Sequence, residues 1–454
     1  MNIWKTKLLA YLHDPPSKCL DLGAHMENAA NLMRAAGFSD EEINAYNRPA
    51  DHTASAADRL PFPNSRASGL SCAFDGVRAR FHHPLGGGEL RFPKEFATAE
   101  LAFETDQTIQ PVCDVSTLSD DEQWRARFFA HWRLYPRNAR ERDHRFAFLP
   151  ADTRLPDHTV WTHMQVVSAL AGCAAGEAKD PPLVPAFLRF QLGPVQDFIA
   201  QARSIRDLWS GSYLLSWLMA AGLKALSEEV GPDAVIFPNL TNQPLFDLHW
   251  RDDLWKRIRI GNKSCWDSLV WANQDLLTPN LPNIFLAVVP AARAGELGSL
   301  VAKAVVAEWK RIADSVWQAC DAAGLFPEDE AGFSKTERRA RFDAQVTRLL
   351  SASWQVTPWP TTLDETLALA AKFKPEMPVS KARQQIEAVV TFAQTQTPIE
   401  HRDRRFYTDD ARTKLNNLGL GWSLLVGLNA WQLDAVRQHR DFAAWAEGGW
   451  NKSA

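Results

Sequence analysis

The sequence predicts an α+β protein in which a helical N-terminal part precedes a ferredoxin-like sheet domain and a helical tail. In the first part, amphipathic helical segments alternate with loops rich in Pro, Gly and Asp. Further along, short apolar strands and long amphipathic helices follow one another in the order β-α-β-β-α-β, which is the split βαβ arrangement. These two patterns divide the chain into residues 1–182, 183–360 and 361–454.

The predicted N-terminal helix ends at a pair of prolines. Its apolar residues fall on one face, and Pro15 and Pro16 stop it because the residue before a proline disfavours helical backbone angles. His13 and Asp14 therefore lie where the helix gives way to a loop. An imidazole and a carboxylate that are adjacent in the chain can both reach one divalent ion.

Composition places the first boundary near residue 182. Residues 175–185 combine small residues, charges and three prolines, which is typical of a linker or a domain edge. The four strands of the second part are predicted at 186–192, 234–240, 283–290 and 351–360. A long helical stretch follows the first strand, a second helix is predicted at 296–320, and helical periodicity continues beyond residue 360.

Charge and cysteine usage exclude several classes of protein. The 50 basic and 54 acidic residues nearly balance, so any binding to nucleic acid has to come from local patches. The six cysteines form no Cys-x-x-Cys pair, which argues against a zinc ribbon or a disulfide framework and favours reduced thiols in a cytoplasmic protein. No apolar run approaches the roughly 18 residues of a membrane span, and no signal-peptide pattern is present.

Histidines and aspartates gather at both ends of the N-terminal part. The two groups comprise His13, Asp14, His25, Asp51 and Asp58, and later His158 and His163. Imidazoles and carboxylates around one or two transition ions lower the pKa of bound water and hold a phosphodiester for in-line attack. A core or capping role stays open for each single histidine, and His131 and His144 are expected on the surface.

The stretch HDPPSK resembles the HDxGK motif of HD-superfamily phosphohydrolases, with Lys18 at the lysine position and Ser17 in place of the glycine. In that superfamily a histidine helix precedes the HD pair, whereas here the matching DHTVWTH follows it, as in a circular permutation. This donor set suits manganese, nickel or cobalt. The predicted catalytic pair is His13 and Asp14, and the predicted metal ligands are His13, Asp14, His25, Asp58, His158 and His163, with Asp51 in reserve.

Several ordered motifs extend the resemblance from residue 1 to about residue 300. Besides HDPPSK, they include FLRFQLGPVQDFIAQARSIRDLWSGSYLLSWL and LPNIFLAVVP. Together they are similar to the large subunit of Cmr-type (type III-B) CRISPR effector complexes. That family has a permuted HD domain associated with metal-dependent cleavage of single-stranded DNA, followed by two palm domains. The resemblance implies an RNA-guided antiviral complex whose partners are other Cmr subunits, guide RNA, target RNA and single-stranded DNA.

The Gly-Gly-Asp-Asp motif that the family uses to make cyclic oligoadenylates is absent from the sequence. The chain therefore resembles the HD domain, the first palm and part of the helical region. Whether it is a portion of a longer subunit or a short natural form stays open. We expect no cyclic oligoadenylate synthesis from this chain alone, because two-metal nucleotidyl transfer requires paired carboxylates. ATP with magnesium is expected only in the complete subunit.

The turn and helix after the first predicted strand form a candidate nucleotide surface. Backbone amides at the start of a helix suit a phosphate, and small residues further along allow a ligand to approach closely. In the family, the first palm forms one wall of the ATP site. The predicted residues are Gly193, Gln196, Asp197, Arg203, Arg206, Ser210 and Gly211. A solvated helix face with ordinary packing behind it is the alternative.

A basic segment with interleaved aromatic residues is the candidate nucleic-acid surface. Arg133, Arg137 and Arg140 lie near Trp132 and Tyr135, a mixture suited to phosphates and stacked bases. Acidic residues in the same segment dilute its charge, so a solvated surface is the alternative.

Three functions remain open for the chain as a whole. The first is the CRISPR subunit with a metal-dependent single-strand nuclease site. The second is a freestanding HD phosphohydrolase that acts on small nucleotides and needs neither palm nor helical tail. The third is a non-catalytic scaffold with a degenerate HD site, which the serine in HDPPSK keeps open.

Overall fold

The computed structural model is an α+β protein, which confirms the predicted class. It describes residues 2–20, 23–46, 49–57, 74, 80–82, 88–92, 109–153, 156–175, 182–326, 334–373, 379–381, 383–384 and 417–438. Within these ranges, no helix combines the length and the apolar character needed to cross a membrane.

One four-stranded antiparallel sheet organises the molecule. Its strands are, in spatial order, β4 (Val235–Phe237), β7 (Ile284–Pro290), β3 (Pro185–Gly193) and β8 (Ser351–Pro358). Leu188 of β3 lies between Ala287 of β7 and Val356 of β8, so β3 is a central strand. Each predicted strand forms, but β4 is short because Pro238, which follows it, has no N–H to donate to the ladder.

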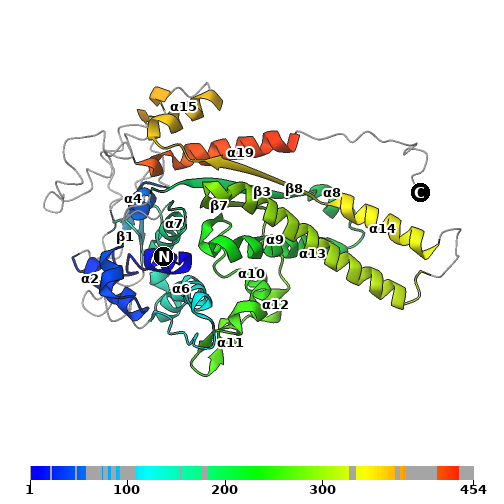
Figure 1. Cartoon of the computed structure of the whole chain (residues 1–454), viewed down its shortest axis with the longest axis horizontal. Helices are drawn as coiled ribbons and strands as arrows, with labels where there is room; N and C mark the ends of the chain where they lie inside the picture. The colour runs from blue at the N-terminus through cyan, green and yellow to red at the C-terminus, as the bar shows by residue number, and fades with distance from the viewer. Residues whose placement is uncertain are drawn as a thin grey trace.

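The two long helices of the sheet domain connect its strands in the predicted order. Helix α9 (Ile205–Val230) joins β3 to β4, and α13 (Ala294–Ala322) joins β7 to β8. Both helices lie on the same face of the sheet and pack against each other (Figure 1). Their approach is close at Gly222, where a Cβ atom would lie 2.9 Å from Val305.

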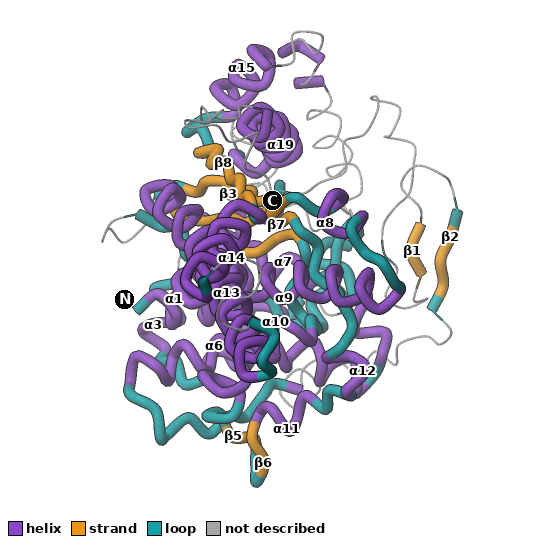
Figure 2. Tube along the Cα trace, turned by 90° about the vertical axis from the view of Figure 1, so that its right-hand side faces the viewer, coloured by secondary structure: helices purple, strands orange, loops and turns teal. Residues whose placement is uncertain are grey.

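Helix α19 (Trp422–Gln438) covers the opposite face of the sheet, as the end-on view shows (Figure 2). Successive residues of a strand point to opposite faces. Phe187 accordingly meets Trp422 at 5.0 Å between ring centroids, whereas Phe190 stacks on Phe285 within the core on the other side. Apolar cover on both faces explains why β3 is buried along most of its length.

Short elements fill the connections of the sheet domain, and the sequence pattern did not indicate them because they are too short to show a period. They are α8 (Gln196–Ala200), η3 (Pro232–Ala234), α10 (Pro244–His249), η4 (Arg251–Trp255), β5 (Arg259–Ile260), β6 (Lys263–Ser264), α11 (Cys265–Leu269), α12 (Asn273–Leu276) and η5 (Ala291–Arg293). The helical stretch predicted after β3 is divided into α8 and α9, since the Ser204 hydroxyl accepts from the Asp207 N–H and starts a new helix.

The N-terminal part is built on a helix, α1, whose second half is buried on all sides. Its elements are α1 (Ile3–Tyr11), α2 (His25–Ala35), α3 (Asp40–Asn44), α4 (Pro49–Ala56), β1 (Arg80–His82), β2 (Glu89–Arg91), α6 (Asp120–Arg142), η2 (His144–Phe148) and α7 (Val160–Ala171). Helix α1 packs against both α6 and α7, and α4 packs on α7. Leu8 and Leu9 point in different directions and both are buried.

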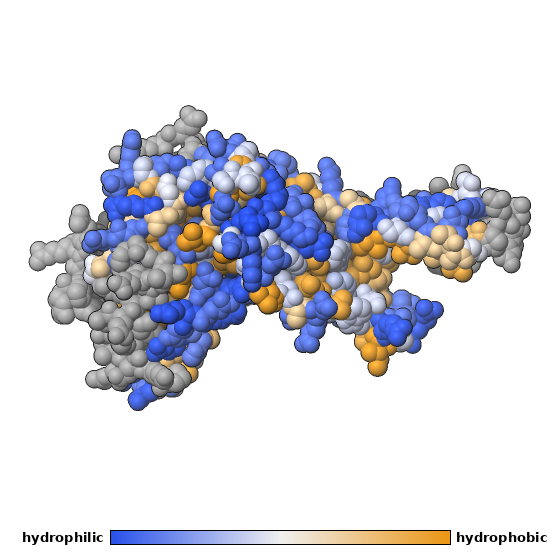
Figure 3. All heavy atoms as spheres, turned by 90° about the horizontal axis from the view of Figure 1, so that it is seen from below, coloured by the Kyte–Doolittle hydropathy of each residue, from blue (hydrophilic) through white to orange (hydrophobic). Residues whose placement is uncertain are grey.

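The remaining described helices extend the two ends of the sheet. They are α14 (Lys335–Leu349), α15 (Leu363–Phe373) and η8 (Leu418–Gly421). Helix α14 packs along α13, and the two extend away from the body of the molecule (Figure 1). Seen from below, the described part of the surface is mostly hydrophilic with scattered apolar patches (Figure 3).

One expectation about the N-terminal part is wrong. His131, expected on the surface, is 4% exposed on the buried side of α6. Its Nδ1 lies 2.7 Å from the carbonyl oxygen of Arg127, and the amide nitrogen of Gln110 lies 3.2 Å from its Nε2. Both ring nitrogens are therefore satisfied inside the protein, which makes burial of the neutral ring acceptable.

Candidate metal centre

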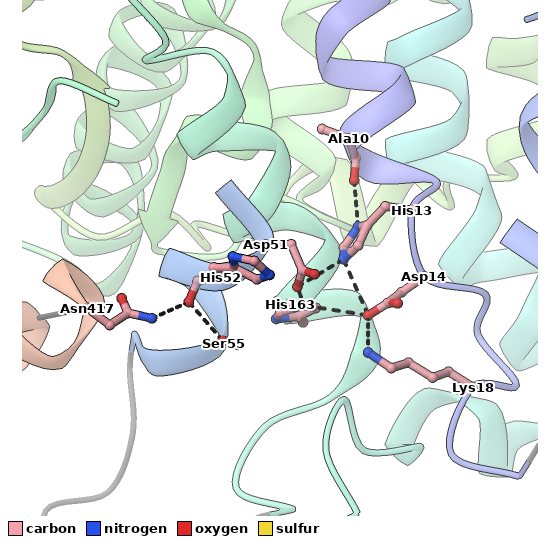
Figure 4. A network of polar contacts seen from close by, with 9 residues as sticks. All are labelled: Ala10, His13, Asp14, Lys18, Asp51, His52, Ser55, His163 and Asn417. Atoms are coloured by element: carbon pink, nitrogen blue, oxygen red, sulfur yellow. Dashed lines mark hydrogen bonds and ion pairs between the residues drawn. The ribbon is translucent and has the colours of Figure 1, made fainter. Parts of the chain in front are cut away.

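Two histidines and two aspartates, from the turn after α1 and from helices α4 and α7, meet beside the end of α1 (Figure 4). They are His13, Asp14, Asp51 and His163, and one ligand atom of each lies within 4.8 Å of the others. Three of the four are buried, and Asp51 is partly exposed. In the part of the chain that the structure describes, this is the one group of three or more such side chains with that spacing.

Local structure places each of the four side chains. His13 and Asp14 follow the last turn of α1, which the two prolines stop. Asp51 lies in the first turn of α4, where the helix dipole favours a carboxylate. His163 lies near the start of α7, whose first turn is capped by the hydroxyl of Thr159. Because α1 and α4 both pack against α7, the three helix ends converge.

The His13 ring is held in one orientation. Its Nδ1 lies 2.7 Å from the carbonyl oxygen of Ala10. A carbonyl oxygen only accepts, so Nδ1 carries the proton, and Nε2 keeps a lone pair in the neutral ring. This Nε2 lies 3.3 Å from Oδ2 of Asp14 and 3.5 Å from Oδ1 of Asp51, is buried, and makes no hydrogen bond within the described structure.

The His163 ring faces the same two carboxylates. Its Nε2 lies 3.2 Å from Oδ1 of Asp51 and 3.5 Å from Oδ2 of Asp14. The centroids of the two imidazole rings are 5.3 Å apart. One nitrogen of each histidine and one oxygen of each aspartate are thus directed toward a common point.

The charges in this group strongly influence one another. Burial tends to lower the pKa of His13, but the carboxylates of Asp14 and Asp51 outweigh it and raise that pKa to about 10. Burial tends to raise the pKa of both carboxyl groups, yet His13 holds each of them below its ordinary value, with Lys18 adding to the effect on Asp14. Burial dominates at His163 and lowers its pKa to about 4. The group therefore concentrates negative charge that cations must balance.

A cavity of about 420 Å³ opens onto three of the four side chains. His13, Asp14 and Asp51 form one wall, and His25 and Met33 of α2 lie in the lining as well. The ammonium of Lys18, also in the lining, lies 2.6 Å from Oδ2 of Asp14. A small phosphate-bearing group inside this cavity would meet a cation and the candidate metal ligands together.

The other predicted ligands lie apart from the central four. His25 shares the cavity but is not within ligand spacing of the group. His158 pairs its Nδ1 with Oδ1 of Asp157 at 2.8 Å, and its ring is 5.9 Å from that of His163. Asp58 lies outside the described residues. Asp51, which the sequence ranked only as a reserve, is a central member of the group. The sequence undervalued it because its position beside the other ligands depends on how α4 packs on α7.

The predicted nucleotide surface lies at the end of β3 and along α8 and the start of α9. Gln196, Asp197, Arg203, Arg206 and Ser210 are exposed, and Gly193 and Gly211 are partly exposed. The guanidinium of Arg203 is paired with Asp207. Ile205, Leu208 and Trp209 also project from this surface, with Ile205 86% exposed. The helix face is therefore solvated, and apolar as well as charged groups are accessible on it.

The three arginines of the basic segment have different surroundings. Arg133 is 1% exposed and its guanidinium bonds to Asp247 at 2.8 Å and to the side-chain oxygen of Asn242 at 2.7 Å. Because it is buried and paired, it is not available for the predicted nucleic-acid contact. Arg137 is partly buried and bonds to Glu141 and to a backbone carbonyl. Arg140 is exposed.

Comparisons with known proteins show what the chain is similar to. Residues 187–314 match the family described as CRISPR-associated protein Cmr2, N-terminal. Over 348 residues the chain is 28% identical to the CRISPR system Cmr subunit Cmr2 of Pyrococcus furiosus, which covers 66% of this chain and 36% of the relative. The chain is thus similar to Cmr2 subunits over about two thirds of its length, and residues 187–314 carry the Cmr2 N-terminal match.

A second Cmr2 relative matches more narrowly. The Cmr2 subunit of Saccharolobus solfataricus is 32% identical over 114 residues, which is 25% of this chain and 11% of the relative. The matches thus span well under half the length of these Cmr2 proteins. A cryo-EM structure of the type III-B Cmr-beta complex bound to cognate target RNA contains a similar chain, with 15% identity and a TM-score of 0.47 over 82% of this chain and 39% of that one.

Proposed function

We propose that this chain carries an HD-type metal centre that cleaves single-stranded DNA within a type III-B Cmr complex. The observation that supports this most is the convergence of His13, Asp14, Asp51 and His163 within 4.8 Å beside a cavity. Similarity to Cmr2 subunits supports the setting, which is RNA-guided antiviral defence.

The residues present fit a divalent transition ion. Two imidazole nitrogens and two carboxylate oxygens match manganese, nickel or cobalt better than magnesium, which prefers oxygen ligands. The buried Nε2 of His13 has no hydrogen-bond partner in the described structure, as expected of a ligand atom. When bound, such an ion lowers the pKa of bound water and polarises a phosphodiester.

The chain's own groups have distinct roles in this proposal. The carbonyl of Ala10 fixes the tautomer and orientation of His13, an effect that tunes a ligand through its second nitrogen. The ammonium of Lys18 orients the Asp14 carboxylate and offers positive charge to a phosphate in the cavity. His158 and His25 border the group and are candidates for contacts with a second ion or with substrate.

Single-stranded DNA is the expected polymeric substrate. The ligand group is mostly buried, so the scissile phosphate must enter a cavity of about 420 Å³. An unstacked strand can bend into such a cavity, whereas a duplex would first have to be opened, at a cost of a few kcal/mol. Cleavage of single strands should therefore exceed cleavage of duplexes.

We also propose that residues 183–360 form the first palm of the subunit and one wall of an ATP site. The β-α-β-β-α-β order and the exposed Arg203 and Arg206 after β3 support this assignment. The Gly-Gly-Asp-Asp motif is absent from the sequence, so binding without oligoadenylate synthesis is the expected behaviour of this chain. The proposed partners are other Cmr subunits, guide RNA and target RNA, and the proposed location is the cytoplasm.

The decisive experiment compares the native chain with a His13→Gln/Asp14→Asn double variant, whose side chains keep their approximate size. Elemental analysis after exposure to manganese measures metal content, and labelled single-stranded and duplex oligonucleotides measure cleavage. We expect the native chain to hold metal and cut the single strand, and the double variant to do neither. The His52→Gln variant, altered at an exposed histidine beside Asp51, is the matched control.

Two other outcomes correspond to the alternative functions. Hydrolysis of small phosphomonoesters without cleavage of DNA would assign a freestanding phosphohydrolase. Equal metal content in the native chain and the double variant would mean that these residues hold no ion, and the scaffold function would then stand.

A further inference from the structure

A second cavity, of about 220 Å³, lies among α6, α7, the end of α1 and the loop after β4. None of its lining residues lines the first cavity, and none belongs to the metal-ligand group. The loop reaches it through Asn239 and Asn242, and Asn242 has a positive φ of 64° that the Arg133 guanidinium supports by bonding to its side chain. The cavity is therefore built from well-fixed elements on both sides.

The lining combines aromatic rings, neutral polar groups and one cation. Tyr11, Trp132 and Trp161 supply the rings, and Arg140 supplies an exposed guanidinium. No carboxylate occurs among the described residues that line this cavity. Such a lining disfavours a cationic ligand and suits a planar, neutral ring that carries an anionic group.

One buried donor in the lining lacks a partner. Trp132 is 1% exposed, and its indole Nε1 makes no hydrogen bond to any group in the described structure. An indole N–H can only donate, and leaving it unsatisfied in the interior has a cost of about 1–3 kcal/mol. A ligand acceptor inside the cavity would remove that cost.

An acceptor is also available nearby. The amide nitrogen of Gln165 donates to the backbone carbonyls of Val235 at 2.9 Å and Asp233 at 3.4 Å. Its Oε1 accepts no bond from the part of the chain that the structure describes, so it remains free to receive one. A donor from Trp132 and an acceptor from Gln165 are together the kind of pair that reads the edge of a nucleobase.

We infer that this cavity binds the base of a nucleotide, with the phosphate held at its rim by Arg140. Pockets for complete drug-sized ligands occupy about 300–1,000 Å³, so a cavity of about 220 Å³ admits one ring system and leaves the phosphate outside. The exposed Arg140 lies where such a phosphate would emerge. This inference does not depend on the proposed metal centre, and the nucleotide can be free or part of a single strand.

Calorimetric titration of the whole chain at low salt tests the inference without metal. The probes are the four common nucleoside 5′-monophosphates and ribose 5-phosphate, which has the phosphate but no base. At least one monophosphate should bind, and ribose 5-phosphate should bind far more weakly. Trp132→Phe, which keeps an aromatic ring and removes the N–H, should weaken that binding about three- to tenfold.

Arg140→Gln keeps the test valid if the buried substitution impairs folding. It should weaken nucleotide binding about two- to fivefold and reduce its salt dependence, because an exposed charge is lost. Arg142→Gln, at another exposed arginine of α6 outside the lining, is the matched control and should bind as the native chain does. A short single strand with and without one abasic position distinguishes a base in a strand from a free nucleotide.

Three results would overturn the inference. The first is an absence of base-dependent binding for both the monophosphates and the oligonucleotide. The second is native affinity in both Trp132→Phe and Arg140→Gln. The third is binding that Arg206→Gln abolishes while Arg140→Gln leaves it intact, which would place the nucleotide on the α8–α9 surface instead.

Discussion

The ammonium of Lys7 lies 2.7 Å from Oδ2 of Asp233, and both side chains are almost completely removed from solvent. Lys7 also donates to the carbonyl oxygen of Ser168 at 3.2 Å. These three residues belong to α1, η3 and α7, so one buried cation joins two helices next to the metal-ligand group to the start of β4. Burial raises the pKa of Asp233, and the charge of Lys7 opposes that rise.

Removing this cation should destabilise the whole molecule. Lys7→Met leaves the Asp233 carboxylate buried without a counter-ion, and the free energy of unfolding should fall by about 3–5 kcal/mol. Chemical denaturation measures the loss. Lys5→Met, at a more exposed lysine of the same helix that pairs with Glu42, should change stability by about 1 kcal/mol or less. A Lys7→Met/Asp233→Leu double variant should recover part of the loss, and a single variant as stable as the native chain would contradict the argument.

Stability should fall in acid because of His131. Burial lowers its pKa to about 4, whereas the unfolded chain takes up this proton near pH 6.5. Acid therefore favours unfolding: the contribution of His131 is complete above about pH 6.5 and declines as the pH falls toward 4, by up to about 3 kcal/mol. His131→Gln should show a flatter profile of unfolding free energy over this interval, while His144→Gln, at an exposed histidine, should follow the native profile.

Gly231 should not tolerate a side chain. Its φ is 90°, and a Cβ atom there would clash with Oδ1 of Asp233 and lie 2.9 Å from Cε of Lys7. Gly231→Ala should lower the free energy of unfolding by about 2–5 kcal/mol, through both backbone strain and overpacking. A lower melting temperature would report this loss. Gly324→Ala is the control, because its φ of 72° carries the strain alone with open space around the Cβ position. Equal effects of the two substitutions would show that the contacts around Gly231 give way easily.

Manganese should stabilise the native chain. A ligand that binds only the folded state contributes about 2.7 kcal/mol at one hundred times its dissociation constant. Asp51→Asn removes one carboxylate charge from the group and should reduce the manganese-induced rise in melting temperature, whereas His52→Gln should preserve it. Chelator should return the native chain to the melting temperature of the metal-free protein. An undiminished rise in Asp51→Asn would exclude Asp51 as a ligand.

ATP should bind weakly to the chain without turnover. The exposed Arg203 and Arg206 offer charge to phosphates, but the sequence lacks the Gly-Gly-Asp-Asp motif, whose carboxylates would position two ions for nucleotidyl transfer. Mass spectrometry after incubation with ATP and magnesium should detect no oligoadenylates. Their formation would reveal a catalytic carboxylate pair elsewhere in the chain.

Sequence periodicity was sufficient to predict the long, regular helices and strands of the fold, but it did not predict the short, irregular elements. The apolar alternation of β3 and the long amphipathic α13 were evident because several periods repeat within one element. The elements between β4 and β7 contain too few residues to repeat, and their burial depends on packing against α9. The burial of Arg133 was equally hidden, since its partner Asp247 lies more than a hundred residues away in the chain.

The candidate site was predictable only where its residues are neighbours in the chain. His13 and Asp14 were identified because the prolines after them mark the end of a helix. Asp51 was undervalued because nothing local distinguishes it from Asp58, and its role follows from the docking of α4 on α7. Trp132 was noted only as an aromatic near basic residues, since the absence of a partner for its indole N–H is a property of the folded interior.

The order in which the chain emerges during synthesis gives the metal-ligand group a further property. His13 lies just after α1 and His163 lies on α7, at opposite ends of the first 171 residues, so the group can close only after a very long stretch of chain has been ordered. Long-range closure of this kind comes late in folding, because the chain loses conformational entropy before the stabilising contacts form. A nascent or truncated chain that ends before α7 would carry His13, Asp14 and Asp51 but no complete site. The nuclease activity proposed for the chain would therefore be withheld until α7 has docked onto α1.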